Sequence, residues 1–198
     1  MNSFSETEVL SEIKAVEVME QSNTPPGNTD TELSEEEKRE IDSEFSRYED
    51  RASVGLEALR IVQKHRGWVS DESLQAVSDY LEIPPAQLES VATYFQLIFR
   101  QPVGREVMLL CKSASCWIMG CSRLQVHIRN RLQIAPGQTS EDGIFTLLET
   151  PCLGDCDKAP VMLVGEQVHH NITEKSIDKW IEQKIIQHKT TDADQLPD

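Results

Sequence analysis

The sequence has no apolar run long enough to cross a bilayer, so we expect no membrane span. Its N-terminus lacks the basic segment and continuous apolar core of a secretory signal, and it is too acidic for a mitochondrial transit peptide. We therefore expect a cytoplasmic protein, in which thiols stay reduced. The chain also has no glycine-rich nucleotide loop and no grouping of acid, base and nucleophile, so we do not expect an enzyme that acts alone.

Basic residues are few, and the net charge of −15 is unevenly spread. Residues 1–50 contain 15 Asp and Glu against 4 Lys and Arg, whereas the other 148 residues contain 19 against 15. Such a balance repels nucleic acid and anionic membranes. The helix–proline turn–helix pattern of residues 70–96 could suit a DNA reader, but its second helix offers no Arg or Lys to phosphates. We expect no nucleic-acid partner.

The first half of the chain predicts an acidic arm followed by a helical bundle. Residues 1–31 combine a weak amphipathic pattern with a linker rich in Pro, Gly, Asn and Thr, so we expect them to lie outside the folded body as a flexible arm. Residues 32–100 contain helix signals: a capping box at Ser34 and Glu37, a stop at Gly67, and Pro84-Pro85 at a helix start. The expected apolar stripes include Phe95. The first of these helices should run from residue 34 to about residue 48.

The second half predicts an α/β domain over residues 104–188, followed by a polar tail over residues 189–198. The order β-α-β-β-α matches a compact domain of thioredoxin-like size. The first helix of this domain should bury Ile118, and Gly165-Glu166 should turn the last two strands into a hairpin. The expected strands are 106–111, 144–148, 161–164 and 167–170, and the expected helices are 117–132 and 174–187. The predicted fold class is therefore α+β, with a helical bundle before the α/β domain.

Four of the five cysteines lie in two short loops, and each loop follows a predicted strand. The first loop places four residues between Cys111 and Cys116, and the second places three residues between Cys152 and Cys156. Four thiolates that meet at one point indicate a metal or iron–sulfur site. The odd total argues against a disulfide framework.

Three other interpretations of the cysteines are possible. Simple packing of small apolar side chains does not account for two pairs at strand–loop junctions. A dithiol redox site would use Cys-x-x-Cys, which occurs nowhere in the sequence. Structural zinc is the serious rival, but its ligand pairs commonly come from tighter turns. The wider spacing, with small residues in both loops, favours a two-iron cluster over zinc.

The segments around the cysteines resemble a known family. The Cys-x4-Cys loop, 35 further residues, and then Cys152-Leu-Gly-Asp-Cys156 continued by Asp-Lys-Ala-Pro are similar to the thioredoxin-like 2Fe–2S family. The resemblance covers about residues 32–188. Other matching stretches are residues 57–69, 91–95, 99–104, 136–139 and 145–149. The N-terminal arm has no counterpart, and residues 91–95 exchange two aromatics relative to the family pattern.

The resemblance implies that Cys111, Cys116, Cys152 and Cys156 ligate one 2Fe–2S cluster. It implies an electron-transfer subunit of an NADH:quinone oxidoreductase (respiratory complex I), without activity alone, in the peripheral arm of an inner-membrane complex. The cluster would exchange single electrons with FMN on a partner flavoprotein subunit that binds NADH, and further subunits of the complex would be partners. The same family also serves as the diaphorase subunit of NAD-linked hydrogenases and formate dehydrogenases. A zinc-stabilised interaction module is the alternative of a different class.

The remaining cysteine and the histidines are expected to stay outside the site. Cys121 falls where the family pattern needs no cysteine, so we interpret it as a packed or spare thiol. His169 and His170 are adjacent on a strand and should point to opposite sides, so neither is expected to be a ligand. Asp155 and Asp157 flank Cys156, and their negative charge would disfavour adding an electron to a cluster there. Turn formation accounts for the two aspartates equally well.

Overall fold

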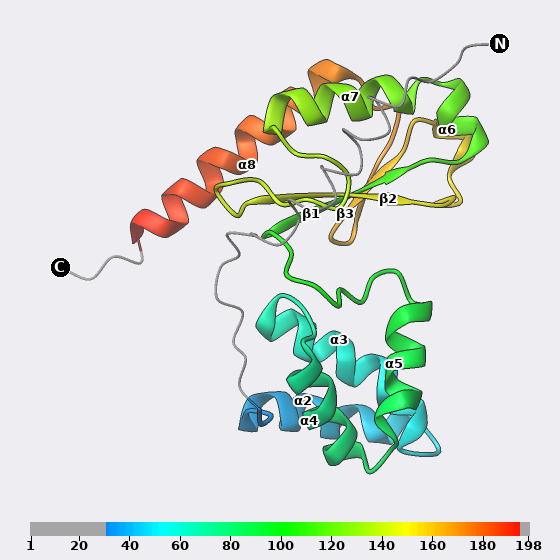
Figure 1. Ribbon diagram of the computed structural model, residues 1–198, viewed down its shortest axis with the longest axis vertical. Helices are drawn as coiled ribbons and strands as arrows, with labels where there is room; N and C mark the ends of the chain where they lie inside the picture. Colours follow the sequence, from blue (N-terminus) through cyan, green and yellow to red (C-terminus); the bar gives the residue numbers. More distant parts are fainter. Residues whose placement is uncertain (1–30, 195–198) are drawn as a thin grey trace, which may run out of the picture.

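The computed structural model describes residues 31–194, which divide between an all-helical part and an α/β part (Figure 1). The arm expected at the N-terminus lies outside the described residues, apart from its last residue. The helical part consists of α2 (Glu35–Glu44), α3 (Gly55–Arg66), α4 (Asp71–Leu81) and α5 (Pro85–Tyr94), with 3-10 turns η2 (Phe45–Arg47) and η3 (Ala52–Val54). The α/β part consists of β1 (Glu106–Cys111), α6 (Ala114–Ile118), α7 (Cys121–Leu132), β2 (Phe145–Thr150), η4 (Cys156–Lys158), β3 (Met162–Val164), β4 (Gln167–His169) and α8 (Glu174–Asp194).

The helix boundaries of the first part follow from the residues that cap them. Ser34 and Glu37 form the expected capping box at the start of α2. The Ser70 hydroxyl accepts a hydrogen bond at the start of α4. Gly67 ends α3 with a φ of 85°, a conformation that favours glycine. Pro85 occupies the first position of α5, where its missing N–H removes no helical bond. The four helices share one apolar core.

Two details of the helical part differ from expectation. The first helix ends at Glu44 and continues only as the 3-10 turn η2, rather than running to residue 48. Phe95, expected on a buried stripe, is 42% exposed, because α5 ends at Tyr94 and residue 95 takes an extended conformation there. Tyr94 is still more exposed and packs edge-on against Phe95.

The α/β part is a four-stranded sheet in the order β2-β1-β3-β4. β1 pairs in parallel with β2 and antiparallel with β3, and β3 forms the expected hairpin with β4. Helices α7 and α8 cover one face of the sheet, and the helical part lies beyond the other face (Figure 1). The core between the sheet and the helices includes Met108, Ile128, Phe145, Leu147 and Ile181, all fully buried.

The helices of this part also depart from the predicted bounds. The single helix expected over residues 117–132 is two helices, because Gly120 interrupts it with a φ of 95°. The break turns Ile118 outward, so this residue is 74% exposed rather than buried. The final helix continues to Asp194, well into the expected tail, since no helix breaker occurs before Pro197. Within residues 31–194, none of the helices combines the length and apolar character that a bilayer crossing requires.

Candidate metal centre

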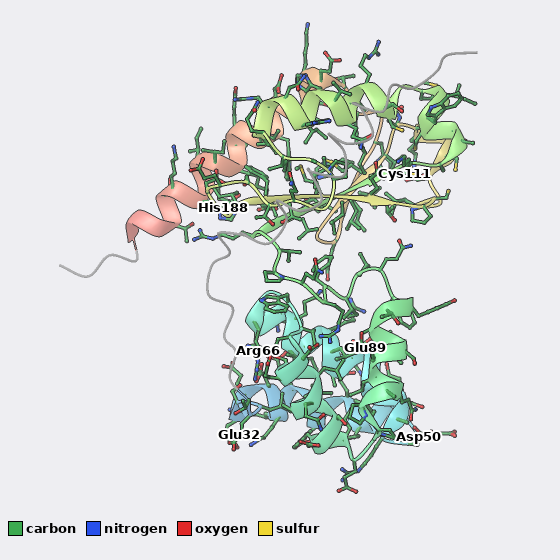
Figure 2. The ribbon with its side chains drawn as sticks, viewed as in Figure 1. Glu32, Asp50, Arg66, Glu89, Cys111 and His188 are labelled. Carbon is green, nitrogen blue, oxygen red and sulfur yellow. The ribbon has the colours of Figure 1, made fainter. Side chains whose placement is uncertain are left out.

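The two cysteine loops leave the same edge of the sheet. Cys111 is the last residue of β1 and pairs in register with Thr150, the last residue of β2. Because β1 and β2 are parallel, the loop with Cys116 and the loop with Cys152 begin side by side. Figure 2 labels Cys111 at this end of the sheet, with His188 near the opposite end of β1. A hydrogen bond from Lys112 N to Thr150 O (2.9 Å) joins the loops at their base.

Within each loop the two thiols lie next to one another. The sulfurs of Cys152 and Cys156 are 3.3 Å apart, and Cys111 and Cys116 are also in thiol–thiol contact. Ser113 connects the pairs, because its hydroxyl lies 3.4 Å from Cys111 Sγ and also reaches Cys152. The first pair is buried and the second is exposed. The arrangement is therefore two adjoining pairs, one covered by protein and one open to the surface.

Each pair contains one thiol that ionises more readily than its neighbour. Burial opposes ionisation of Cys111, but contacts with Ser113 and the Leu153 N–H outweigh it and lower the pKa. Burial and the neighbouring Cys111 raise the pKa of Cys116. In the other loop, the Gly154 N–H lowers the pKa of Cys152, and the contact with Cys152 raises the pKa of Cys156. In each pair, the thiol with the lowered pKa (Cys111 or Cys152) therefore loses its proton before its neighbour does.

Gly154 shapes the second loop. Its φ of 90° favours glycine, and its N–H donates to Cys152 Sγ at 3.3 Å. No other atom lies near the position that a Cβ would take, so backbone conformation rather than space demands glycine here. Backbone N–H groups aimed at sulfur are typical of iron–sulfur sites, where they tune the reduction potential.

The charges beside the thiols are paired with other side chains. Lys112, the residue after Cys111, forms an ion pair of 2.8 Å with Glu149. Asp155 binds Lys158 (3.3 Å) and the imidazole of His170. The His170 contact, followed by Lys158, holds the pKa of Asp155 below its usual value. Asp157 is exposed, in keeping with a solvated turn residue.

The cysteine and histidines expected outside the site lie as follows. Cys121 is 2% exposed, begins α7 and packs in one small apolar cluster with Cys111 and Cys116. Burial raises the pKa of its thiol. His169 packs edge-on against Trp180, whereas His170 contacts Asp155. The contact between His170 and Asp155 could not be predicted from the sequence, because it depends on where the β3–β4 hairpin lies relative to the second cysteine loop.

The donor set fits an iron–sulfur cluster. The four thiols form two pairs, Cys111 with Cys116 and Cys152 with Cys156. In a 2Fe–2S cluster each iron takes two protein ligands, so two adjoining thiolate pairs are the set it requires. The Gly154 N–H and the Ser113 hydroxyl supply the surrounding hydrogen bonds.

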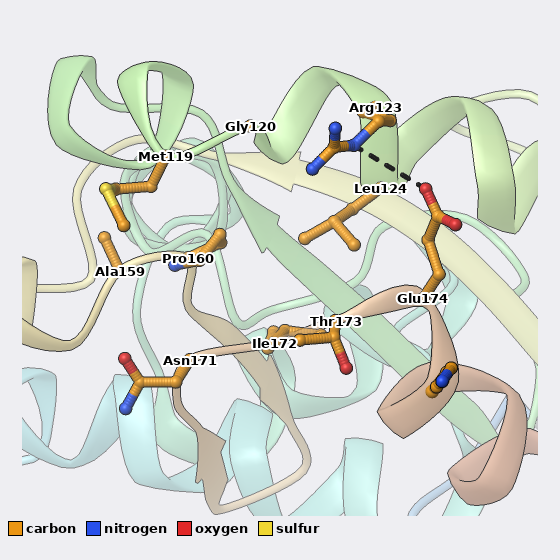
Figure 3. Close-up of a pocket in the computed structure, with 11 residues that line it drawn as sticks. Met119, Gly120, Arg123, Leu124, Ala159, Pro160, Asn171, Ile172, Thr173 and Glu174 are labelled. Atoms are coloured by element: carbon orange, nitrogen blue, oxygen red, sulfur yellow. Dashed lines mark ion pairs between the residues drawn. The ribbon is translucent and has the colours of Figure 1, made fainter.

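A surface hollow of about 510 Å³ lies beside the cluster of cysteines, where α7 and α8 begin (Figure 3). Met119 and Gly120 line it on one side, and Asn171 to Lys175 on the other. Arg123 and Glu174 form an ion pair of 3.6 Å across it. Ala159 and Pro160, joined by a cis peptide bond, complete the lining and connect the hollow to the second cysteine loop.

Comparison with known proteins matches these features to one family. A family model described as thioredoxin-like [2Fe-2S] ferredoxin matches residues 41–184. The chain is 46% identical over 160 residues to the E subunit of NADH-quinone oxidoreductase from Escherichia coli (strain K12), and the match covers 81% of this chain and 96% of that protein. A protein of the same name from Pseudomonas aeruginosa is 43% identical over 150 residues, covering 76% and 90%.

Solved structures of low sequence identity share the fold. One is the crystal structure of an NAD+-reducing [NiFe]-hydrogenase in the air-oxidized state, with a TM-score of 0.59 and 24% identity. The match covers 72% of this chain and 24% of that one. The H2-reduced state of such a hydrogenase gives a TM-score of 0.57 at 23% identity. In these structures the same fold is a fraction of a much longer chain.

Proposed function

The chain belongs to the thioredoxin-like [2Fe-2S] ferredoxin family, and we propose that it is the electron-transfer subunit of an NADH:quinone oxidoreductase. Two observations support this role. Two relatives of that name are 46% and 43% identical, and the E. coli protein is covered over almost its whole length. The thiol pairs at the ends of two adjacent parallel strands provide the ligand set, and this geometry carries the proposal.

Four residues would hold the cluster. Cys111 and Cys116 would supply one pair of thiolates, and Cys152 and Cys156 would supply the other. The bound 2Fe–2S cluster supplies one-electron chemistry, which the side chains around it do not provide by themselves. The protein's part is to present the thiols, exclude water from the buried pair and hydrogen-bond the sulfurs, through the Ser113 hydroxyl at Cys111 and the Gly154 N–H at Cys152. The α/β part does this work, and the helical part and the acidic arm contribute surface for assembly.

The partner would be a flavoprotein subunit that binds NADH and FMN and exchanges single electrons with this cluster. Two features of the surface support a protein partner at this edge. Cys152 and Cys156 are exposed, so the cluster would lie close to whatever covers them. Trp117, Ile118 and Met119, which directly follow Cys116, are 64%, 74% and 58% exposed, and large apolar side chains of this kind are enriched at interface centres. The assembly would form the peripheral arm of an inner-membrane complex on its cytoplasmic side.

A second candidate is the corresponding diaphorase subunit of an NAD-linked hydrogenase or formate dehydrogenase. The observation that supports this second candidate is the fold that the chain shares with part of an NAD+-reducing [NiFe]-hydrogenase. The local role would be the same, and only the parent enzyme would differ. Subunits that copurify with a tagged chain from its native cells distinguish the two: quinone-reductase subunits support the first, and hydrogenase or formate dehydrogenase subunits support the second.

The purified chain is expected to be reddish brown, with iron and acid-labile sulfide in equal amounts and a 2Fe–2S EPR signal after reduction. It should not oxidise NADH alone, because it has no nucleotide loop of its own. Visible absorption, metal analysis and EPR of anaerobically prepared protein test this. A colourless protein with stoichiometric zinc would support the zinc-stabilised interaction module and refute the proposal.

Deleting residues 1–31 is expected to leave the cluster intact. Among the described residues, those after position 31 include both ligand loops and the members of both apolar cores. The truncated chain should therefore retain the visible spectrum and EPR signal of the full chain, while its association with the partner subunits can weaken. Loss of the cluster on truncation would mean that the arm contributes to the folded site.

A further inference from the structure

The second cysteine loop is held by a contact from outside the ligand loops. His170 directly follows strand β4, and its Nε2 contacts Oδ2 of Asp155, the residue before Cys156. Both side chains are about one-third exposed, at 33% and 30%. The other carboxylate oxygen of Asp155 binds Lys158 at 3.3 Å. Asp155 thus joins the cysteine loop to the end of the β3–β4 hairpin.

Backbone hydrogen bonds continue the same junction. Asn171 N donates to Lys158 O at 2.8 Å, and Ile172 N donates to Pro160 O at 3.1 Å. Figure 3 shows Asn171 and Ile172 lying opposite Ala159 and Pro160. The backbone after Cys156 is therefore fixed to the segment before α8. His170, from that same segment, adds a side-chain anchor at the residue directly before Cys156.

We propose that His170 is a positioning residue that, through Asp155, holds the second cysteine loop in the conformation that receives the cluster and offsets the negative charge beside Cys156. This inference rests on the proposed cluster. It has a mechanical part, because the exposed thiol pair has little packing to fix it. It has an electrostatic part, because a carboxylate next to a cluster ligand disfavours reduction, and a hydrogen bond from imidazole spreads and offsets that charge.

His188 offers a matched control. Its Nε2 lies 3.0 Å from Oε1 of Glu106, so it makes the same kind of histidine–carboxylate contact. Glu106 begins β1, whereas Cys111 ends it, so this contact lies at the far end of the strand from the cysteines (Figure 2). A variant at His188 therefore loses an equivalent pair without touching the cysteine loops.

The test compares full-length, cluster-loaded protein carrying His170→Ala, Asp155→Asn, both substitutions, or His188→Ala. Far-UV circular dichroism establishes that each variant is folded. The rate of cluster loss is followed by bleaching of visible absorption in the presence of an iron chelator, and the midpoint potential is measured by EPR-monitored redox titration. Neither readout needs the partner subunits.

We expect His170→Ala to lose the cluster about tenfold faster and to shift the midpoint potential downward, since groups that orient metal ligands commonly contribute about 10- to 100-fold in affinity. Asp155→Asn should shift the potential upward, because it removes the negative charge. In the Asp155→Asn background, His170→Ala should add no further shift of the midpoint potential, because the charge that His170 offsets is gone. His188→Ala should match the wild type.

Three results would overturn the inference: wild-type cluster retention and potential in His170→Ala, an undiminished potential shift by His170→Ala in the Asp155→Asn background, or the same changes in His188→Ala. These outcomes presuppose a wild-type protein that carries the cluster. A wild-type chain without iron and sulfide would instead contradict the proposed function.

Discussion

A Cys156→Ser variant is expected to retain less than about one-tenth of the wild-type cluster, as judged by iron content, visible absorption and the EPR signal of the reduced protein. The thiolate is the form that binds iron, and a serine hydroxyl does not ionise near neutral pH. Removing one of two thiolates from the exposed pair leaves one iron with an incomplete ligand set. The loss should therefore exceed the effect of altering any group around the ligands.

The same exchange at Cys121 is the control. Cys121 is buried beside the first thiol pair but follows the ligand loop rather than belonging to it. Cys121→Ser should leave cluster content near that of the wild type, although burying a hydroxyl there can lower the free energy of unfolding by about 1–3 kcal/mol. Cys121→Ala, which buries no polar group, separates the two effects.

The two variants together decide the ligand assignment. Serine is close to cysteine in size, and residue 156 is exposed, so Cys156→Ser should fold normally. An unchanged 2Fe–2S signal in Cys156→Ser would show that this residue is not a ligand. Loss of the cluster in both Cys121→Ser and Cys121→Ala, with the protein still folded, would place Cys121 in the ligand set.

The sequence predicts most of the fold because its local signals agree with the tertiary packing. Capping at Ser34 and Ser70, the stop at Gly67 and the start at Pro85 all depend on backbone chemistry that neighbouring residues determine. The sheet follows from short apolar segments and from the Gly165-Glu166 turn. The strand order is not local, but the β-α-β-β-α sequence of elements restricts it to few arrangements.

The errors occur where a local break in a helix or a contact between distant residues overrides the periodic pattern. Ile118 fits a helical apolar stripe, but Gly120 rotates the preceding turn and exposes it. Phe95 lies one residue beyond the helix whose face it was expected to share. The Asp155–His170 contact joins residues 15 positions apart, and the Glu37–Arg66 contact joins residues 29 apart. No sequence periodicity reports such pairs, so only the structure reveals what surrounds Cys156 and what lies at the centre of the helical part.

The second large effect is expected at the buried Glu37–Arg66 pair of the helical part. Glu37→Gln should lower the free energy of unfolding by about 3–5 kcal/mol, because it leaves the Arg66 guanidinium buried without this counter-charge. The Glu37 side chain is 2% exposed and the Arg66 side chain 4%. Two hydrogen bonds of 2.7 and 2.8 Å join them in a bidentate pair. Urea unfolding followed by far-UV circular dichroism measures the change.

Glu35→Gln is the matched control in the same helix. Glu35 also pairs with a base, Lys38, at 2.8 Å, but its side chain is 86% exposed. Loss of such an exposed pair should leave the free energy of unfolding almost unchanged, because water screens the interaction. A Glu37→Gln variant as stable as Glu35→Gln would refute the structural role assigned to the buried pair.

The pH dependence of unfolding tests independently whether the charge of Glu37 stabilises the protein. Burial opposes ionisation of Glu37, but the contacts with Arg66 and Ser34 outweigh it and lower its pKa below 4.5. A carboxyl whose pKa is lower in the folded state stabilises the protein above its unfolded pKa, and this contribution is lost as the pH falls through the folded pKa. The difference in stability between wild type and Glu37→Gln should therefore be full at about pH 6 and shrink below about pH 4.5. A constant difference across this range would mean that the loss of stability does not depend on the charge of Glu37, and it would contradict this explanation.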